Sequence, residues 1–512
     1  MPRGKPTPLP PPLQGYRADL SEWRMPLDFI AEGVNVLPRD GKIVARSGFR
    51  KLESTGFGER VMGGTFYINE VNLKKTVVGG LTKRKQFISG AWADITGPAW
   101  TGNNESQARF ATFQYGNIIY VIGVNDKDVT VHWDGAAGTD SALPGAPIAK
   151  DLTIVANRVL YANPTIGGNR YPFSIIYSAF NDHTQTPSSN LLTVAHGFGN
   201  VVAVRAIGAE AAAIYLDKGQ FILTAQGGLA PFRSDFRASQ PGPVSPACVV
   251  SVGEAHYYLG IDGNVYRFDG SSCVPIGEYV QPAISTSLSA NYRALTHGVF
   301  ERARREIHWF WVPVGEIDVK AGISYHVEKK TWSPIHSFQR YISSSFEWDE
   351  QSALAWTGLS GTWTALGLTY PTWISMGGTQ NPTQLLGHAG GQTYIYGGQS
   401  TDDGDAFEIM FRYPRQAPDG RLVRVDAIES FFKQPQSSMD VEILLGLADG
   451  PASTITYEIA KTYDLAATPN PMAEYENVQG RYPTVKFRSM DVNVGLEYHG
   501  GLGYIYDRGV PA

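Results

Sequence analysis

A short hairpin-like pattern recurs along this sequence. Its clearest copy spans residues 257–270, where a run of apolar residues is followed by Asp262-Gly263 and then by a second apolar run. Looser copies lie at residues 113–120, 154–161, 214–223 and 385–396. The Asp-Gly, Gly-Asn and Gly-Gly pairs in these copies tolerate the positive φ angles that tight hairpin turns require. Hairpins repeated over most of a chain predict a radial β-repeat, that is, a β-propeller.

The repeats are irregular. The aromatic residue that follows each turn serves as a marker, and the markers are unevenly spaced, at Tyr120, Tyr161, Phe221, Tyr266, Trp332 and Tyr394. Arrays of the WD40 or kelch type keep a nearly constant period. The spacing therefore predicts an irregular propeller with insertions and leaves the number of blades open.

The pattern changes after about residue 404. Runs of alternating apolar and polar residues follow at 422–428, 439–445, 454–459, 484–488 and 492–498. Alternation with a period of two is typical of strands that bury one face, as in a β-sandwich. We therefore expect an all-β chain with a propeller at 57–404 and an accessory β-sandwich at 405–512.

The N-terminal region is rich in proline. Residues 1–22 predict an extended arm, either a disordered tail or an arm that lies along a neighbouring subunit, because proline stiffens the chain and removes N–H donors. Residues 23–56 form a turn-rich segment that connects this arm to the propeller. The N-terminus also lacks the apolar core of a signal peptide.

Composition excludes some classes of protein. Charged residues make up 18% of the chain, below the usual value of about 25%, which suggests that partners cover part of the surface. The net charge of −5 argues against a dedicated nucleic-acid binder, which needs a basic face. No run of 18 apolar residues predicts a membrane span. Cys248 and Cys273 are too few for a disulfide framework and predict free thiols in a reducing compartment.

Motifs with catalytic chemistry are absent from the sequence. There is no Gly-x-Ser-x-Gly elbow, no His-Glu-x-x-His and no phosphate-binding loop. A glycoside hydrolase needs two carboxylates across a cleft, and the sequence does not place any of the candidates Asp182, Asp262, Asp269 and Glu278 in one. The histidines in strand-like runs, His256, His308 and His326, are interpreted as structural. We therefore predict no catalytic, cofactor-binding or metal-binding residue and no enzymatic activity.

Two further patterns have a structural and a functional interpretation. The loops at 125–128 and 402–405 are rich in oxygen ligands but lack the spacing of known calcium loops, so solvated loops are expected. Several tryptophans could stack on sugars, although strand aromatics more often fill a propeller core; they are Trp309, Trp311, Trp332, Trp348, Trp356, Trp363 and Trp373.

The order of several segments resembles a known family. An Asn-x-x-Pro element and an Arg-x-Gly turn occur within residues 35–49. They are followed by segments at 215–223, 242–246, 258–270, 307–311 and 325–332. This order resembles that of propeller-bearing nozzle or hub proteins in the tails of short-tailed phages.

The resemblance implies a structural virion protein. Such a protein forms a ring, commonly a hexamer, at the distal end of the tail, contacts an adaptor ring and fibres, and lets DNA pass through its lumen without specific binding. It would be assembled in the host cytoplasm, and its N-terminal arm would tether neighbouring subunits. Two alternatives remain open: a carbohydrate-binding or receptor-binding propeller at the tail tip, and a glycoside hydrolase.

Overall fold

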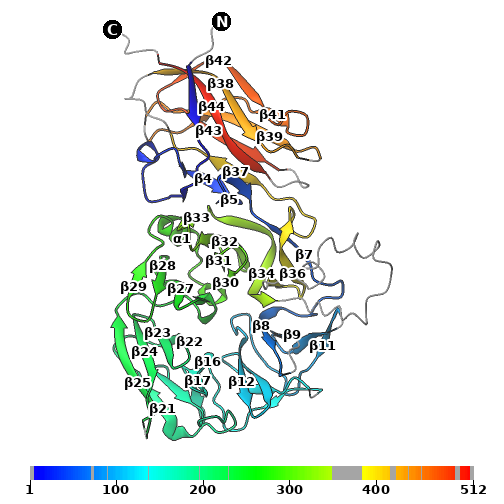
Figure 1. Ribbon diagram of the computed structural model, residues 1–512, viewed down its shortest axis with the longest axis vertical. Helices are drawn as coiled ribbons and strands as arrows, with labels where there is room; N and C mark the ends of the chain where they lie inside the picture. The colour runs from blue at the N-terminus through cyan, green and yellow to red at the C-terminus, as the bar shows by residue number, and fades with distance from the viewer. Residues whose placement is uncertain are drawn as a thin grey trace.

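The computed structural model describes residues 5–70, 74–88, 90–136, 138–194, 196–228, 230–348, 383–415, 422–435, 437–450, 452–490 and 496–507. Figure 1 shows two β-rich lobes. The larger lobe is a ring of small antiparallel sheets, and the smaller lobe is a sandwich that lies beside the rim of the ring. The chain is thus an all-β protein with a propeller-like lobe.

The described residues form seven propeller blades. Each of the first five is a separate four-stranded antiparallel sheet. Blade 1 contains β8 (Val61–Ile68), β9 (Lys74–Gly80), β10 (Arg84–Ile88) and β11 (Ala91–Asp94). Blade 2 contains β12 (Arg109–Tyr115), β13 (Ile118–Val124), β14 (Val131–Trp133) and β15 (Ser141–Ala142). Blade 3 contains β16 (Asp151–Val155), β17 (Arg158–Ala162), β20 (Ser174–Tyr177) and β21 (Leu191–Thr193), with a side hairpin of β18 (Thr165–Ile166) and β19 (Asn169–Arg170).

The next two blades repeat this plan. Blade 4 contains β22 (Val201–Ala206), β23 (Ala211–Leu216), β24 (Gly219–Ala225) and β25 (Phe232–Ala238). Blade 5 contains β26 (Val250–Val252), β27 (Ala255–Leu259), β28 (Val265–Phe268) and β29 (Cys273–Pro275). A short helix, α1 (Gln281–Ser287), follows blade 5. The described part of the chain has no helix that is long and apolar enough to cross a membrane.

Blades 6 and 7 share one continuous sheet, because β32 pairs with β34. Blade 6 contains β30 (His297–Glu301), β31 (Glu306–Trp311), β32 (Val319–His326) and β33 (Thr331–Trp332). Blade 7 contains β34 (His336–Trp348), β35 (Thr383–His388), β36 (Thr393–Gln399) and, as its outer strand, β7 (Gly48–Lys51). A strand from residues 23–56 therefore completes the last blade. The expected propeller at 57–404 omits it because its partner strand β36 lies far away in the sequence.

The first strand of each blade lies towards the centre of the ring (Figure 1). Neighbouring inner strands approach closely. A side chain at Gly64 in β8 would place its Cβ only 2.7 Å from the ring of Phe346 in β34. Blades 1 and 7 therefore contact each other directly, and the ring of blades is closed.

Turn chemistry explains several hairpins. In blade 2 the loop Gly116-Asn117 joins residues that pair directly, and Gly116 has φ +61°. In blade 3 the loop Ala156-Asn157 has positive φ at both residues. The copy around Asp262 differs from the predicted two-residue turn, because residues 260–264 all lie in the connection between β27 and β28. The wider turn still needs Gly263, whose φ is +79°.

The smaller lobe is a sandwich of two six-stranded sheets that combine both ends of the chain. One sheet contains β1 (Lys5–Leu9), β5 (Val36–Arg39), β6 (Lys42–Ala45), β38 (Val423–Phe432), β42 (Met472–Gly480) and β44 (Glu497–Asp507). The other contains β4 (Glu32–Val34), β37 (Ile409–Arg412), β39 (Asp440–Leu447), β40 (Thr456–Tyr457), β41 (Lys461–Asp464) and β43 (Thr484–Ser489). Aromatic rings pack against one another in the core, with centroids 5.0 Å apart for the stacked pair Phe411 and Phe487 and 4.9 Å apart for the tilted pair Phe487 and Tyr498.

The described part of the N-terminal arm is not a disordered tail, because β1 pairs with β44 of the same chain. Beyond it, β2 (Gly15–Tyr16) pairs with β3 (Phe29–Ile30). The sandwich therefore starts at the N-terminus as well as after residue 405. The predicted strand at 492–498 lies partly outside the described residues.

Candidate functional site

The axis of the propeller is closed by polar side chains near one face. The carbonyl oxygen of Thr296, just before blade 6, accepts a hydrogen bond from Gln107 Nε2 of blade 2 at 3.4 Å. The same oxygen accepts a hydrogen bond from Ser245 Oγ, just before blade 5. Blade 2 lies across the ring from blades 5 and 6. Among the described residues, this contact therefore spans the axis at one face.

A charged cluster joins blades 2, 3 and 4 next to this contact. The buried carboxylate of Asp151 pairs with Arg109 at 3.2 Å and with Arg205. The backbone N–H of Val204 also donates to Asp151, and Arg205 donates to the carbonyl of Pro246 ahead of blade 5. Burial and, next, the charge of Arg205 lower the pKa of Arg109 to about 10. The Arg109 guanidinium therefore stays charged at neutral pH, and the cluster sets two guanidinium groups against one carboxylate.

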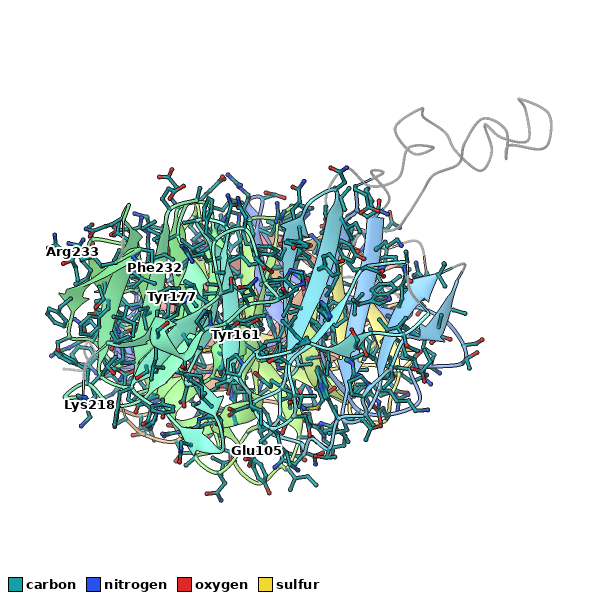
Figure 2. The ribbon with its side chains drawn as sticks, turned by 90° about the horizontal axis from the view of Figure 1, so that it is seen from below. Glu105, Tyr161, Tyr177, Lys218, Phe232 and Arg233 are labelled. Carbon is teal, nitrogen blue, oxygen red and sulfur yellow. The ribbon has the colours of Figure 1, made fainter. Side chains whose placement is uncertain are left out.

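A cavity of about 400 Å³ opens at the same face. It is lined by Asn103, Glu105, Ser106, Gln107, Asp126, Lys127, Lys150, Val244, Ser245, Pro246 and Ala294. Figure 2 shows Glu105 at the lower face of the ring, with Arg233 towards the upper face. The buried Oε1 of Gln107 has no hydrogen-bond partner among the described residues. The cavity is large enough for a small polar ligand.

Sequence reasoning missed this cavity. Most of its residues come from loops that precede the inner strands of four blades, as Gln107 precedes β12 and Lys150 precedes β16, and Asp126 and Lys127 come from the connection between β13 and β14. Such residues form no contiguous motif. The cavity could have been found if the first residue of each inner strand had been known, because the residue before each inner strand lies at the same end of the propeller axis.

Three of the candidate carboxylates accept hydrogen bonds within their own turns. Asp262 accepts hydrogen bonds from Asn264 N at 3.1 Å and from Tyr266 Oη at 2.7 Å. Asp269 accepts bonds from the backbone N–H groups of Ser271 and Ser272, which lower its pKa. Asp182 accepts a bond from Thr184 N at 2.8 Å. None of these three carboxylates, nor Glu278, lines the axial cavity.

The histidines are held in buried or half-buried polar networks. His256 lies between the hydroxyl of Tyr215 at 2.7 Å and the carbonyl of Ala206 at 2.9 Å, and burial lowers its pKa to about 4. His308 contacts Ser324 Oγ at 2.7 Å and a carboxylate oxygen of Glu301 at 3.1 Å. His326 accepts a hydrogen bond from Lys329 N at 3.1 Å.

One cluster has a ligand set that could hold a metal ion: Glu301, Glu306 and His308 are buried close together. Two arginines already neutralise its carboxylates. Arg39 of the sandwich bonds both oxygens of Glu306, at 2.9 and 2.8 Å, and Arg304 pairs with Glu301 at 3.0 Å. The cluster is therefore accounted for as an ionic network that joins the sandwich to blade 6.

The two oxygen-rich loops differ from each other. In the first, Asp128 accepts bonds from Thr101 N and Asn125 Nδ2, so this loop is tied to the segment between β11 and β12. In the second, the prediction of a solvated loop is wrong for Asp402, which has no exposed surface. Its carboxylate pairs with buried Arg46 at 2.6 Å. Arg46 lies between β6 of the sandwich and β7 of the propeller, so this ion pair joins the two lobes.

The described tryptophans of the list above are core residues. Trp309, Trp311, Trp332 and Trp348 are buried, and Trp309 donates to the carbonyl of Cys248 at 3.0 Å. Trp356, Trp363 and Trp373 lie outside the described residues. Cys248 and Cys273 are buried free thiols, and burial raises the pKa of both.

Comparisons with known proteins give a fold-level likeness alone. No protein-family model and no curated protein match the chain. Among solved structures, BBS1N in complex with ARL6DN is 8% identical with a TM-score of 0.41, covering 69% of this chain and 97% of that one. The computationally designed Ika8 protein is 11% identical with a TM-score of 0.37, covering 68% and 99%. YCF48 from Cyanidioschyzon merolae is 10% identical with a TM-score of 0.36, covering 69% and 99%. Similarity this weak carries no argument about function.

Proposed function

We propose that this chain is a structural protein of a phage tail and assembles into a homo-oligomeric ring, a hexamer in the family that it resembles. The ring acts as a nozzle or hub: it contacts an adaptor ring and fibres and passes DNA during ejection. In this proposal the protein is made in the host cytoplasm, becomes part of the virion tail and has no catalytic activity. The proposal starts from the order of the sequence segments described above.

The contact across the propeller axis favours a conduit that lies between copies of the chain. The hydrogen bonds to the carbonyl of Thr296 from two other blades span the centre of each propeller at one face. DNA therefore passes between copies and not through one of them, so a conduit requires several copies around a common lumen. The net charge of −5 suits such a lumen, because a strongly basic wall would bind the phosphates and slow translocation.

An exposed apolar loop carries the proposal. In the connection between β31 and β32, Val314 is 68% exposed and Ile317 is 66% exposed. The loop is held against β34, since Tyr341 Oη donates to Glu316 at 3.3 Å. Large aliphatic side chains presented on a fixed loop are typical of a protein–protein contact. A ring needs one such patch to meet a different surface on the next copy.

The assembly test compares two charge substitutions by light scattering after size exclusion and by electron microscopy. The wild-type chain is expected to form closed multi-copy rings. Val314→Asp/Ile317→Asp is expected to remain monomeric, because aspartate opposes burial of the loop in an interface. Ile459→Asp is the matched control, since Ile459 is 84% exposed on the sandwich, and it should still form rings.

The copy number in particles provides the decisive result. Quantitative mass spectrometry of purified virions should find several copies per particle. If the isolated protein is monomeric at all concentrations and particles contain one copy or none, the ring is refuted. Rings that form equally well in Val314→Asp/Ile317→Asp would show that the loop is not the contact.

A second candidate function is receptor or carbohydrate binding, and the axial cavity favours it. Glu105, Gln107 and Lys150 offer acceptors and a donor to a ligand rich in hydroxyl groups. The test is a glycan array with the wild-type chain and with Gln107→Leu. Binding that the substitution weakens would support this function, and no binding to any bacterial surface glycan would refute it.

A further inference from the structure

Strand β1, which pairs with β44 at an edge of the sandwich, has an unusual sequence. Strand β1 pairs antiparallel with β44 in the register Lys5 to Ile505, Thr7 to Gly503 and Leu9 to Gly501. The two residues between these positions are Pro6 and Pro8, which have no N–H group. In an antiparallel ladder, alternate residues direct their N–H and C=O groups to the same side. The ladder to β44 is therefore carried by residues 5, 7 and 9, and the two prolines occupy the outward-facing positions.

This pattern stops the sheet at β1. A further strand needs N–H donors on the free side of β1, and Pro6 and Pro8 offer none. A strand from another molecule cannot extend this sheet by adding to β1. It can use the edge of β44 only by taking the place of β1.

Strand β1 is attached by few side-chain contacts. Pro6, Thr7 and Pro8 are exposed, and Leu9 is the side chain of residues 6–9 that enters the sandwich core. A small apolar cavity of about 30 Å³ lies beside Leu9 and is also lined by Gly503 and Ile505 of β44. Edge strands with little buried apolar surface are the first parts of a fold to open. When β1 leaves, β44 is still paired with β38 along its other side.

The place of β1 in the molecule makes it accessible to a second copy. Figure 1 shows β1, the dark blue strand, in the part of the sandwich that lies away from the propeller. Residues 10–14 connect β1 to β2 and begin with three prolines. A proline-rich segment of this length is stiff and reaches about 15 Å. It therefore keeps a nearly fixed distance between β1 and β2.

We infer that the β44 edge is a strand-acceptor site and that its partner in the assembled ring is β1 of the neighbouring copy. This inference rests on the proposed ring. In an isolated chain β1 pairs with its own β44, because the tether gives it a high effective concentration. In a ring, the neighbouring β1 makes the same contacts in the same register, so exchange costs no native contact. The exchange links adjacent copies through backbone hydrogen bonds.

The first test detects exchange in the full-length chain. Copies that carry Thr7→Cys are mixed with copies that carry Gly503→Cys, assembled and oxidised. Thr7 and Gly503 are paired residues, and the separation of such pairs allows a disulfide. A cross-linked species of two chains on a non-reducing gel is expected. The matched control mixes Thr7→Cys with Thr454→Cys, an exposed position elsewhere on the sandwich, and should not cross-link. Assembled rings without the cross-link would overturn the exchange.

The second test measures the strand-acceptor site without assembly. Leu9→Asp in the full-length chain should release β1, because a carboxylate cannot occupy the apolar core. A fluorescent peptide of residues 5–13 should then bind to this variant and not to the wild-type monomer. The same peptide with Leu9→Ala should bind at least about tenfold more weakly. Peptide binding without rings would refute the proposed ring and support the strand-acceptor site, whereas no peptide binding to Leu9→Asp would refute the site itself.

Discussion

The buried ion pair between Arg46 and Asp402 gives the most quantitative prediction. All five N–H groups of the Arg46 guanidinium donate: Nε to Asn35, Nη1 to Asp402 and the Ser47 carbonyl, and Nη2 to Asp402 and the Ser337 carbonyl. The ring of Phe407 lies 3.8 Å from the guanidinium carbon. Neither charged side chain has exposed surface. Asp402→Ala therefore leaves a fully buried positive charge without its counter-ion.

Removing one partner of a buried ion pair costs about 3–5 kcal/mol, because the remaining charge keeps its desolvation penalty. We expect Asp402→Ala to lower the free energy of unfolding by this amount, and Asp402→Asn to lower it less because an acceptor remains. The pair joins β6 to β7, so the substitution should also separate the unfolding of the sandwich from that of the propeller. Urea titration followed by tryptophan fluorescence and by circular dichroism measures both effects.

The control for this prediction is Glu328→Ala, which breaks the exposed pair between Arg305 and Glu328. Exposed pairs contribute about 0–1 kcal/mol because water and salt screen them. If Asp402→Ala unfolds within 1 kcal/mol of the wild-type chain, and the two probes still report one transition, the ion pair does not couple the lobes and the reasoning fails.

Three further predictions concern stability. Burial lowers the pKa of His256 and of His297 from 6.5 to about 4, so the unfolded chain binds more protons than the folded chain between these two pH values. The free energy of unfolding should therefore keep its full value above pH 6.5 and fall by about 3 kcal/mol per histidine as the pH approaches 4. A melting temperature that stays constant between pH 6.5 and pH 4 would contradict this prediction. Gly64→Ala should destabilise the fold by about 1–3 kcal/mol, because the added Cβ meets the ring of Phe346 at 2.7 Å. The urea midpoint of unfolding measures this loss, and Gly138→Ala, where a Cβ meets open space, is the control. Trp309→Ala should lower the free energy of unfolding by about 3–5 kcal/mol, because the indole is buried and bonded to Cys248. Trp309→Phe should lower it less, because most of the buried volume remains. Equal losses for the two variants would mean that the buried volume is not the cause.

Local signals predicted the blades well. The pairs Gly116-Asn117 and Ala156-Asn157 fall in two-residue turns at the positions where the hairpin pattern recurs. The alternation at 422–428 and 484–488 corresponds to β38 and β43, which bury alternate residues. These features depend on neighbours in the sequence, so the sequence carries them directly.

Long-range pairing was beyond sequence reasoning. Asp402 was expected in a solvated loop because its partner Arg46 lies 356 positions away. The strands β4 and β6 are short, and their partners β37 and β44 are near the other end of the chain. The axial cavity has the same cause, since Gln107, Lys150 and Ser245 meet only after the ring of blades has closed. A single sequence contains no signal for contacts between residues that lie so far apart in the chain.

The outer strand of blade 7 has a consequence for synthesis on the ribosome. Strand β7 leaves the ribosome early, but its partner β36 is made only after six complete blades. At about 5–20 residues per second, the first fifty residues wait for roughly 20–70 s before they can pair. During this time the nascent chain has no closed ring, and its N-terminal strands are open to capture by chaperones. A chain that terminates before β36 completes neither lobe, because β36 pairs with β7 in blade 7 and the sandwich needs the strands that follow β36.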